Sequence, residues 1–191
     1  TIQAAPKNIA SEGKICANFD EWVYLRIYTG TGYADRVLRD CLAPVMREAQ
    51  QSGLIDKWFF IRYKDQFEHV RLRFHSPHQA DLMATLVQLQ ARLKLARQDG
   101  LLWRIQTDDY VLEEERYAGK EGLALCEELF RLDSEDVLRQ LEIEEEYQGD
   151  HARWVYAIAS VDHYAQRLCP ATPIREKLLD RRSKEIQTLY I

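Results

Sequence analysis

Hydrophobic and polar residues alternate through residues 58–75, WFFIRYKDQFEHVRLRFH, in a pattern that predicts two strands joined by a short loop at 65–68. Successive side chains of a strand point to opposite faces. The second strand should therefore present an apolar face and a basic face: Val70, Leu72 and Phe74 on one, and His69, Arg71, Arg73 and His75 on the other. In the first strand, Arg62 and Lys64 share a face with each other and are expected on the side of the other arginines.

The earlier segment 21–28, EWVYLRIY, alternates in the same way. Val23, Leu25 and Ile27 share one face, opposite a face that contains aromatic residues and one arginine. If the three strands form one sheet, their apolar faces pack on helices and the aromatic and arginine face stays open. Such a face is typical either of a solvated sheet surface or of a site for an anionic organic ligand. The clustering of arginines favours the ligand site.

The order of the remaining elements indicates the fold. Glycines at 30 and 32 precede an expected helix over 33–51, and Gly53 closes it. Ser76 as N-cap and Pro77 in the first turn begin a second helix, which ends near Gly100 and has a leucine stripe at positions 82, 86, 89 and 93. A fourth strand is expected over 101–112. The order β-α-β-β-α-β predicts an α+β fold with a ferredoxin-like (split βαβ) antiparallel sheet and both helices on one face.

Three regions follow from these patterns. Residues 1–20 lack a clear period and are expected to be a lead-in or linker. Residues 21–119 form the α+β core with its arginine-lined sheet face. Residues 120–191 are predicted to be a helical C-terminal part of the same domain, with helices over 120–131, 134–147 and 150–168 and a piece after Pro173. Asp133 is the expected cap of the second of these helices.

Composition and charge exclude several classes of function. The 191 residues are 46% hydrophobic and 30% charged, as in an ordinary globular domain, and carry a formal net charge of −5. This charge argues against general affinity for nucleic acid or membrane surfaces, so anion binding must come from local placement of positive groups. The four cysteines are scattered without metal-ligand spacing, and no apolar run approaches the roughly 20 residues of a membrane span. We therefore expect a cytoplasmic protein without a metal site or cofactor.

The second candidate motif is YVLEEERYAGKEG at residues 110–122, where a strand runs into a turn and a helix. Glu113 and Arg116 are three residues apart and can form an ion pair, which on a surface is worth less than about 1 kcal/mol. At the end of the fourth strand, however, the motif can bring Arg116 to the rim of the face that presents Arg71 and Arg73.

The segments WFFIRYKDQFEHVRLRFH and YVLEEERYAGKEGLALCEELFRLDSEDVL together resemble the C-terminal glutamate-elimination domain of lantibiotic (lanthipeptide) dehydratases, also found in thiopeptide-type bacteriocin biosynthesis proteins. The resemblance includes EWVYLRIY and covers most of residues 20–140. The family's H-x-R-x-R and E-x-x-R-Y motifs imply the following catalytic residues: Arg71, Arg73, Glu113 and Arg116. We further expect Arg62, His69 and Tyr117 to bind substrate. Ala118 stands where the family usually has glycine. The family also has a functional histidine in a segment near its carboxy terminus, and no counterpart of this segment precedes Ile191, so the chain is expected to be incomplete relative to the family.

The resemblance implies a lyase that eliminates glutamate from glutamylated serine or threonine of a ribosomal precursor peptide and leaves dehydroalanine or dehydrobutyrine. The implied partners are that peptide and a glutamyl-tRNA-dependent glutamylating protein or domain, with no direct nucleic-acid contact. Arginine suits the stabilisation of developing negative charge, but it is too basic to serve as the general base. The oligomeric state is open, and a homodimer is one alternative.

Two other functions remain open at this point. Relatives in thiopeptide pathways form a pyridine ring from two dehydrated residues and expel the leader peptide, although the complete Arg and Glu set favours elimination. A noncatalytic peptide-binding or RNA-binding module could also use an aromatic sheet face. The acidic net charge argues against RNA, and the Glu113 and Arg116 motif argues against simple peptide binding.

Overall fold

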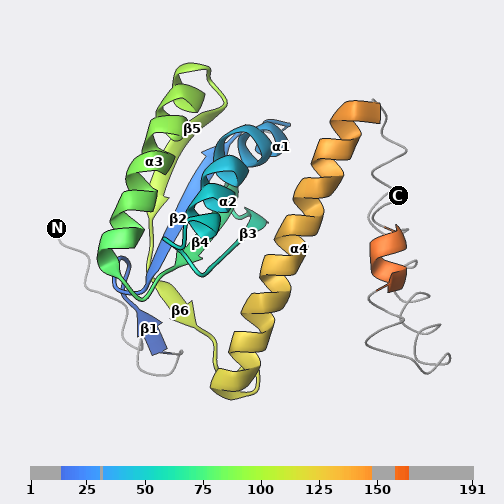
Figure 1. Cartoon of the computed structure of the whole chain (residues 1–191). Helices are drawn as coiled ribbons and strands as arrows, with labels where there is room; N and C mark the ends of the chain where they lie inside the picture. Colours follow the sequence, from blue (N-terminus) through green and yellow to red (C-terminus); the bar gives the residue numbers. More distant parts are fainter. Residues whose placement is uncertain (1–13, 31, 148–157, 164–191) are drawn as a thin grey trace. The chain divides into compact units, whose positions relative to one another are not determined.

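The computed structural model describes residues 14–30, 32–147 and 158–163, and the chain divides into two units, residues 1–141 and 142–191. The named elements of the described part are β1 (Lys14–Cys16), β2 (Trp22–Thr29), α1 (Ala34–Arg36), η1 (Val37–Leu42), α2 (Ala43–Gln51), β3 (Lys57–Lys64), β4 (Glu68–His75), α3 (Gln79–Gln98), β5 (Leu102–Thr107), β6 (Tyr110–Leu112) and α4 (Gly119–Tyr147). Figure 1 shows them coloured along the sequence. The segments α1, η1 and α2 follow one another without a break and make up the helix predicted over 33–51.

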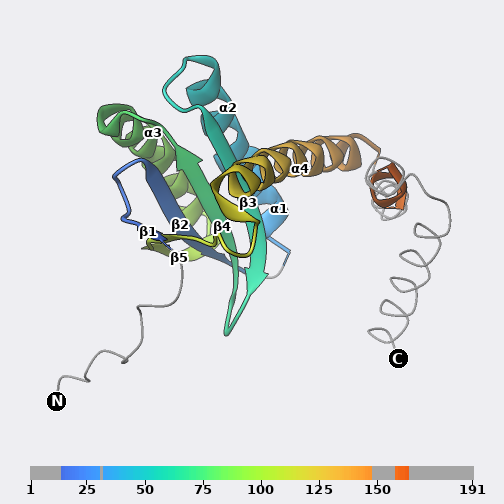
Figure 2. The same ribbon diagram turned by 90° about the horizontal axis from the view of Figure 1, so that it is seen from below.

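A four-stranded antiparallel sheet with the order β3-β4-β2-β5 forms the centre of the first unit. Two helical segments connect its strands, one between β2 and β3 and one between β4 and β5. Both segments lie on the same side of the sheet (Figure 2). This connectivity and strand order are those of the ferredoxin-like fold, so the predicted fold class is confirmed.

The core lies between the sheet and these helices. Val70, Leu72 and Phe74 of β4 are at most 1% exposed and belong to this core, as the alternation predicted. The leucine stripe of α3 is buried in the same cluster. The helix begins two residues later than predicted, because His78 is its N-cap residue while the Ser76 hydroxyl accepts a hydrogen bond from the His78 amide.

The expected position of Arg62 is wrong, because the hairpin loop is one residue shorter than predicted. Lys64 pairs with Glu68, so that Arg62 lies opposite Val70 and shares the helix-covered face. There it forms an ion pair with Asp35 of α1. A loop of four residues would have placed Arg62 opposite Arg71, and a shift of one residue exchanges the two faces of a strand. The aromatic residue Phe59 therefore lies on the arginine face, opposite Arg73.

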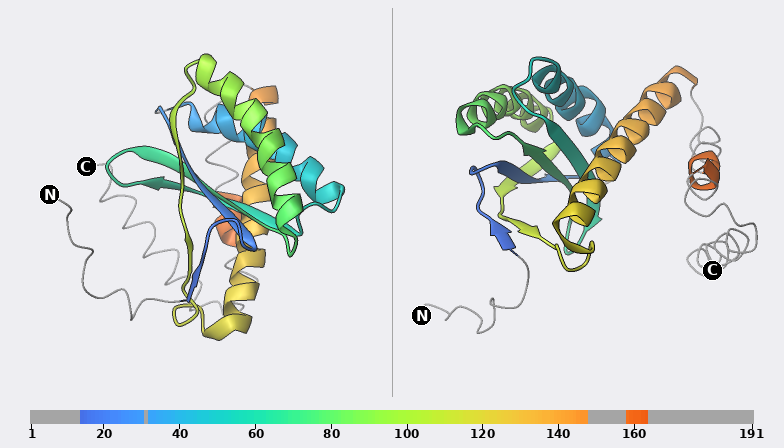
Figure 3. Two further views of the ribbon diagram at one scale, coloured as in Figure 1. Left: turned by 90° about the vertical axis from the view of Figure 1, so that its left-hand side faces the viewer. Right: turned by 60° about the horizontal axis from the view of Figure 1, so that its bottom comes forward.

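The expected fourth strand is interrupted at Asp108 and Asp109. β5 completes the main sheet, whereas β6 leaves it and pairs with β1 in a separate two-stranded sheet. This small sheet lies on the side of the main sheet away from α2 and α3 (Figure 3). The Asp108 amide donates to the Tyr24 carbonyl, and the Asn18 amide donates to the Asp109 carboxylate. The region expected as a lead-in thus contains a strand, and the break directs the segment after β6 over the open face of the sheet.

A single helix, α4, replaces the two helices predicted on either side of Asp133. The chain enters it through a left-handed turn at Ala118 (φ 62°) and Gly119 (φ 93°). At Gly122 the first turn packs against Tyr117, whose carbonyl oxygen would lie 1.6 Å from an added Cβ, so glycine is required there. Of the helix predicted over 150–168 only residues 158–163 are described, and they are helical; the piece after Pro173 lies outside the described residues.

Ser134 of α4 caps the exposed edge of the sheet at β3. Its buried hydroxyl accepts from the Phe60 amide at 3.0 Å and donates to the Phe130 carbonyl of the preceding turn at 2.7 Å. Replacing Ser134 with alanine leaves the Phe60 amide without a partner, so we expect a loss of about 1–3 kcal/mol in the free energy of unfolding. Urea denaturation measures this loss. The matched change Ser52→Ala, at the exposed end of α2, is expected to cost less, and equal losses would contradict a capping role for Ser134.

Candidate active site

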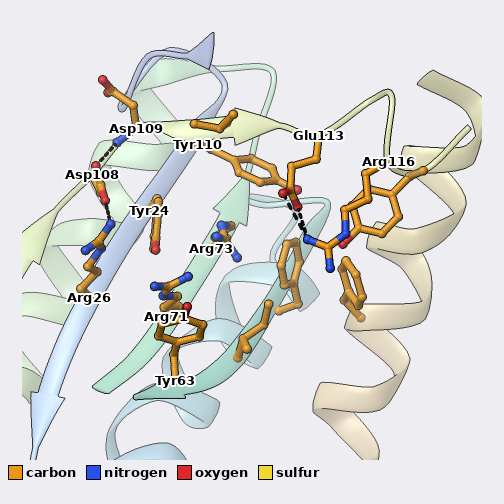
Figure 4. Close-up of a pocket in the computed structure, with 15 residues that line it drawn as sticks. Tyr24, Arg26, Tyr63, Arg71, Arg73, Asp108, Asp109, Tyr110, Glu113 and Arg116 are labelled. Carbon is orange, nitrogen blue, oxygen red and sulfur yellow. Dashed lines mark hydrogen bonds and ion pairs between the residues drawn. The ribbon is translucent and has the colours of Figure 1, made fainter. Parts of the chain in front are cut away.

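A pocket of about 630 Å³ opens on the face of the sheet that the helices leave uncovered. β2, β3 and β4 form its floor, and β6, the following turn and α4 form one wall (Figure 4). Its lining includes all four residues predicted as catalytic: Arg71, Arg73, Glu113 and Arg116. Tyr117 also lines it. The two motifs, far apart in the sequence, therefore meet in one pocket.

Arg73 is surrounded by aromatic rings at the floor of the pocket. The Cζ atom of its guanidinium lies 4.2 Å from the ring centroid of Tyr24, 4.7 Å from that of Tyr110 and 5.5 Å from that of Phe59. Its Nε is covered and has no hydrogen-bond partner in the described part of the chain. Burial lowers the pKa of Arg73, although Tyr24 and Tyr110 oppose this effect. Because the guanidinium is strongly basic, the group is still a cation near neutral pH.

Arg71 lies beside Arg73 and is oriented by His69. Its Cζ lies 3.4 Å from the ring centroid of Tyr63, and its Nε donates to His69 Nε2 at 3.2 Å. His69 Nδ1 lies 3.0 Å from the Phe67 carbonyl oxygen, which fits a neutral ring that donates from Nδ1 and accepts at Nε2. His69 itself is buried behind Arg71 and does not line the pocket. From this position His69 can orient the Arg71 side chain.

Two ion pairs flank these arginines (Figure 4). On one side, Arg116 Nη1 lies 3.2 Å from both carboxylate oxygens of Glu113, and this hydrogen bonding raises the pKa of Arg116. On the other side, Arg26 of β2 pairs with Asp108. Burial acts to lower the pKa of Arg26, but the neighbouring Tyr24 and Asp108 outweigh it, and the pKa is raised. In the described part of the chain, no carboxylate pairs with Arg71 or Arg73.

The pair Arg26 and Asp108 was not singled out in the sequence. The alternation of β2 does place Arg26 on the open face, next to Arg71 in the register. No local pattern shows that the chain turns away from the sheet at Asp108 and returns this carboxylate to the pocket. By contrast, the structure does not bring Arg62 to the pocket, because it lies on the other face of the sheet.

A buried carboxylate of α4 supports the wall of the pocket. Glu127 is 5% exposed; it accepts from the Tyr110 hydroxyl at 3.3 Å, and its other oxygen lies 3.0 Å from Lys57 Nζ. Burial, and next the negative charge of Glu127, raise the pKa of Tyr110 above its usual range, so the hydroxyl stays protonated and donates. These contacts hold the Tyr110 ring against Arg73.

The donor set of the pocket fits an anion. Guanidinium groups bind carboxylates through paired hydrogen bonds, and a partly dry aromatic wall strengthens such contacts. Within the described residues no cluster of three or more potential metal ligands is found, and no helix there is long and apolar enough to cross a membrane. Arg71 and Arg73 provide positive charge that no carboxylate among the described residues pairs with.

Comparisons with known proteins show which family the chain belongs to. The model of a family described as lantibiotic biosynthesis dehydratase C-term matches residues 22–189, well past the point where the sequence motifs end. The chain is 27% identical over 144 residues to the nisin biosynthesis protein NisB of Lactococcus lactis subsp. lactis, covering 75% of this chain and 14% of NisB. It is 29% identical over 119 residues to the subtilin biosynthesis protein SpaB of Bacillus subtilis, covering 62% of this chain and 11% of SpaB.

A solved structure is also similar. The crystal structure of the tRNA dependent lantibiotic dehydratase MibB from Microbispora sp. 107891 superposes with a TM-score of 0.59 and 32% sequence identity, over 75% of this chain and 13% of the MibB chain. This chain therefore spans only a small part of the length of these relatives. Because the family model covers most of its residues, the protein belongs to the lantibiotic biosynthesis dehydratase C-terminal family.

Proposed function

We propose that this chain eliminates glutamate from glutamylated serine or threonine residues of a ribosomal precursor peptide, leaving dehydroalanine or dehydrobutyrine. The observation that carries the proposal is the pair of arginines, Arg71 and Arg73, that no carboxylate of the described chain neutralises in the pocket. Two such cations in one pocket favour an anionic ligand. Membership of the dehydratase family makes a glutamyl ester the ligand of choice.

The elimination breaks two bonds of the esterified residue. A base removes the Cα proton, the electron pair forms the Cα=Cβ double bond, and the Cβ–O bond breaks as glutamate departs with its carboxylate. Negative charge develops on the adjacent peptide carbonyl and on the leaving group, and both are acceptors for guanidinium hydrogen bonds. We assign these roles to Arg71 and Arg73, with Arg116 held at the rim by Glu113 and Tyr117 closing the wall beside it. Arginine is too basic to remove the proton itself.

The proposed reaction defines the partners. The substrate is a precursor peptide that has already been glutamylated, so a glutamylating protein or domain must act first. The MibB relative is named a tRNA dependent dehydratase, and we infer a glutamyl-tRNA-dependent step for the protein that carries this chain. Because glutamyl-tRNA is a cytoplasmic molecule, we place the reaction in the cytoplasm.

Mass spectrometry of a glutamylated peptide tests the proposal. Incubated with the complete protein, the peptide should release free glutamate and become one water lighter than the unmodified chain. The same peptide without the glutamyl group should remain unchanged, because its hydroxyl is a poor leaving group. Failure to release glutamate would contradict the proposed lyase, and ring formation from an already dehydrated peptide would assign the protein to the pyridine-forming branch.

A further inference from the structure

Tyr24 has a central place on the floor of the pocket. The register of β2 and β4 sets Tyr24 opposite Arg73 and sets Arg26 opposite Arg71, so the tyrosine belongs to a group of four with three arginines. Figure 4 shows its hydroxyl directed toward the space between Arg26 and Arg71. The residue is only 4% exposed, yet it lines the pocket.

The backbone of Tyr24 is held on both sides. Its amide donates to Asn18 Oδ1 at 3.1 Å, and its carbonyl accepts from the Asp108 amide at 3.1 Å. These bonds tie Tyr24 to the break between β5 and β6 and to the turn before β2. The ring packs under the Arg73 guanidinium, whose Cζ lies 4.2 Å from its centroid. Backbone hydrogen bonds and the packing of the ring thus fix the position of the hydroxyl.

The Tyr24 hydroxyl is surrounded by donors. The Cζ atom of Arg26 lies 5.7 Å from the Tyr24 ring centroid, and its guanidinium can only donate hydrogen bonds. The neighbouring Arg71 and Arg73 are likewise donors only. In the described part of the chain, no acceptor receives the Tyr24 hydroxyl proton. A hydroxyl that lines the pocket among donors only can donate to an acceptor that enters the pocket.

We propose that Tyr24 is a catalytic residue whose hydroxyl donates a hydrogen bond to the peptide carbonyl oxygen of the reacting residue. The inference rests on the proposed elimination. As the base removes the Cα proton, negative charge collects on this oxygen, and a preformed donor stabilises the charge without being reorganised. Tyr24 keeps its proton throughout, the electron pair passes into the double bond, and glutamate leaves with the electrons of the Cβ–O bond. Arg26, held by Asp108, directs the hydroxyl proton away from itself and into the pocket.

The substitution Tyr24→Phe tests this role because it removes one oxygen and keeps the ring that packs on Arg73. We expect kcat for glutamate release by the complete protein to fall about 100-fold, the scale of one donor to a developing oxyanion. KM for the glutamylated peptide should change less than about 3-fold, because the bond forms mainly in the transition state. Release of glutamate and dehydrated peptide is measured by mass spectrometry over time.

The control is Tyr28→Phe, on the same strand and the same face. Tyr28 is 6% exposed and its hydroxyl lies 3.4 Å from Gln106 Oε1, but it does not line the pocket, so its loss should leave kcat unchanged. A kcat for Y24F within about 3-fold of the parent, a defect confined to KM, or an equal loss in Y28F would each overturn the role of Tyr24. Absence of glutamate release from the unsubstituted protein would instead overturn the proposed function, and this inference with it.

Discussion

Arg73→Met is expected to stop glutamate release almost completely while leaving the protein as stable as before or more stable. Arg73 has no carboxylate partner in the described part of the chain and its Nε lacks a hydrogen bond, so its charge is available to the substrate. Removing such a cation from the transition state should lower kcat/KM about 100-fold to 1000-fold. The glutamylated peptide should then accumulate in a mass-spectrometric assay.

The expected effect on stability has the opposite sign. Burial lowers the pKa of Arg73, which means that folding disfavours its charged form. Replacing the charged group therefore removes a free-energy cost from the folded state. Methionine fills similar space among Tyr24, Phe59 and Tyr110, although the cation–π contacts are lost. Thermal unfolding should therefore show an equal or higher Tm. Residues that are needed for activity commonly lower the stability of the folded protein.

Arg62→Met is the matched control for Arg73→Met. It removes an arginine from the neighbouring strand, but from the opposite face, where Arg62 pairs with Asp35. We expect elimination at close to the parent rate. If Arg62→Met abolished elimination and Arg73→Met did not, the assignment of the open face as the active face would be wrong.

Glu127→Ala is expected to cause a clear loss of stability. The substitution leaves the buried Tyr110 hydroxyl without its acceptor and the Lys57 ammonium without its counter-ion. Removal of one partner from a buried ion pair typically costs 3–5 kcal/mol; because the Lys57 side chain is 30% exposed, we expect about 2–3 kcal/mol. Denaturant unfolding followed by circular dichroism measures this quantity.

Glu128→Ala provides the comparison within the same turn of α4. Its carboxylate pairs with Arg131 at 2.6 Å but is 51% exposed, so its removal should cost less than about 1 kcal/mol. A loss as large as that of Glu127→Ala would show that the helix, rather than the buried carboxylate, is sensitive to the change. A small loss for Glu127→Ala would mean that water replaces the carboxylate beside Tyr110.

Local patterns were sufficient where one strand or helix has a single apolar face. The strand β4 can bury only one of its faces, because Val70, Leu72 and Phe74 are apolar and the alternating Arg71 and Arg73 are charged. The structure confirms this orientation. The leucine stripe of α3 is a similar case. The order of these elements then restricted the fold to the ferredoxin-like arrangement. The convergence of the H-x-R-x-R and E-x-x-R-Y segments on one pocket was also predicted from their expected places in that fold.

Local patterns failed where the outcome depends on contacts between distant segments. β3 has aromatic residues on both faces, so its orientation depends on the length of the hairpin loop. As a result Arg62 lies on the helix-covered face and not on the face of Arg71 and Arg73. α4 continues past Asp133, and there the Ser134 hydroxyl bonds to the preceding turn and to the edge of β3, a contact that no helix-capping signal reveals.

The sequence by itself determined the fold class, the basic face of β4 and the residues of the two motifs, because strand alternation and helix periodicity are local properties of the chain. Only the tertiary structure decided that β6 leaves the sheet to pair with β1, and that Asp108 thereby meets Arg26. It also decided that Glu127 supports Tyr110 and that the Tyr24 hydroxyl points toward the space between Arg26 and Arg71. These contacts join residues far apart in the chain, and their free energies depend on burial and on the neighbours that folding brings together.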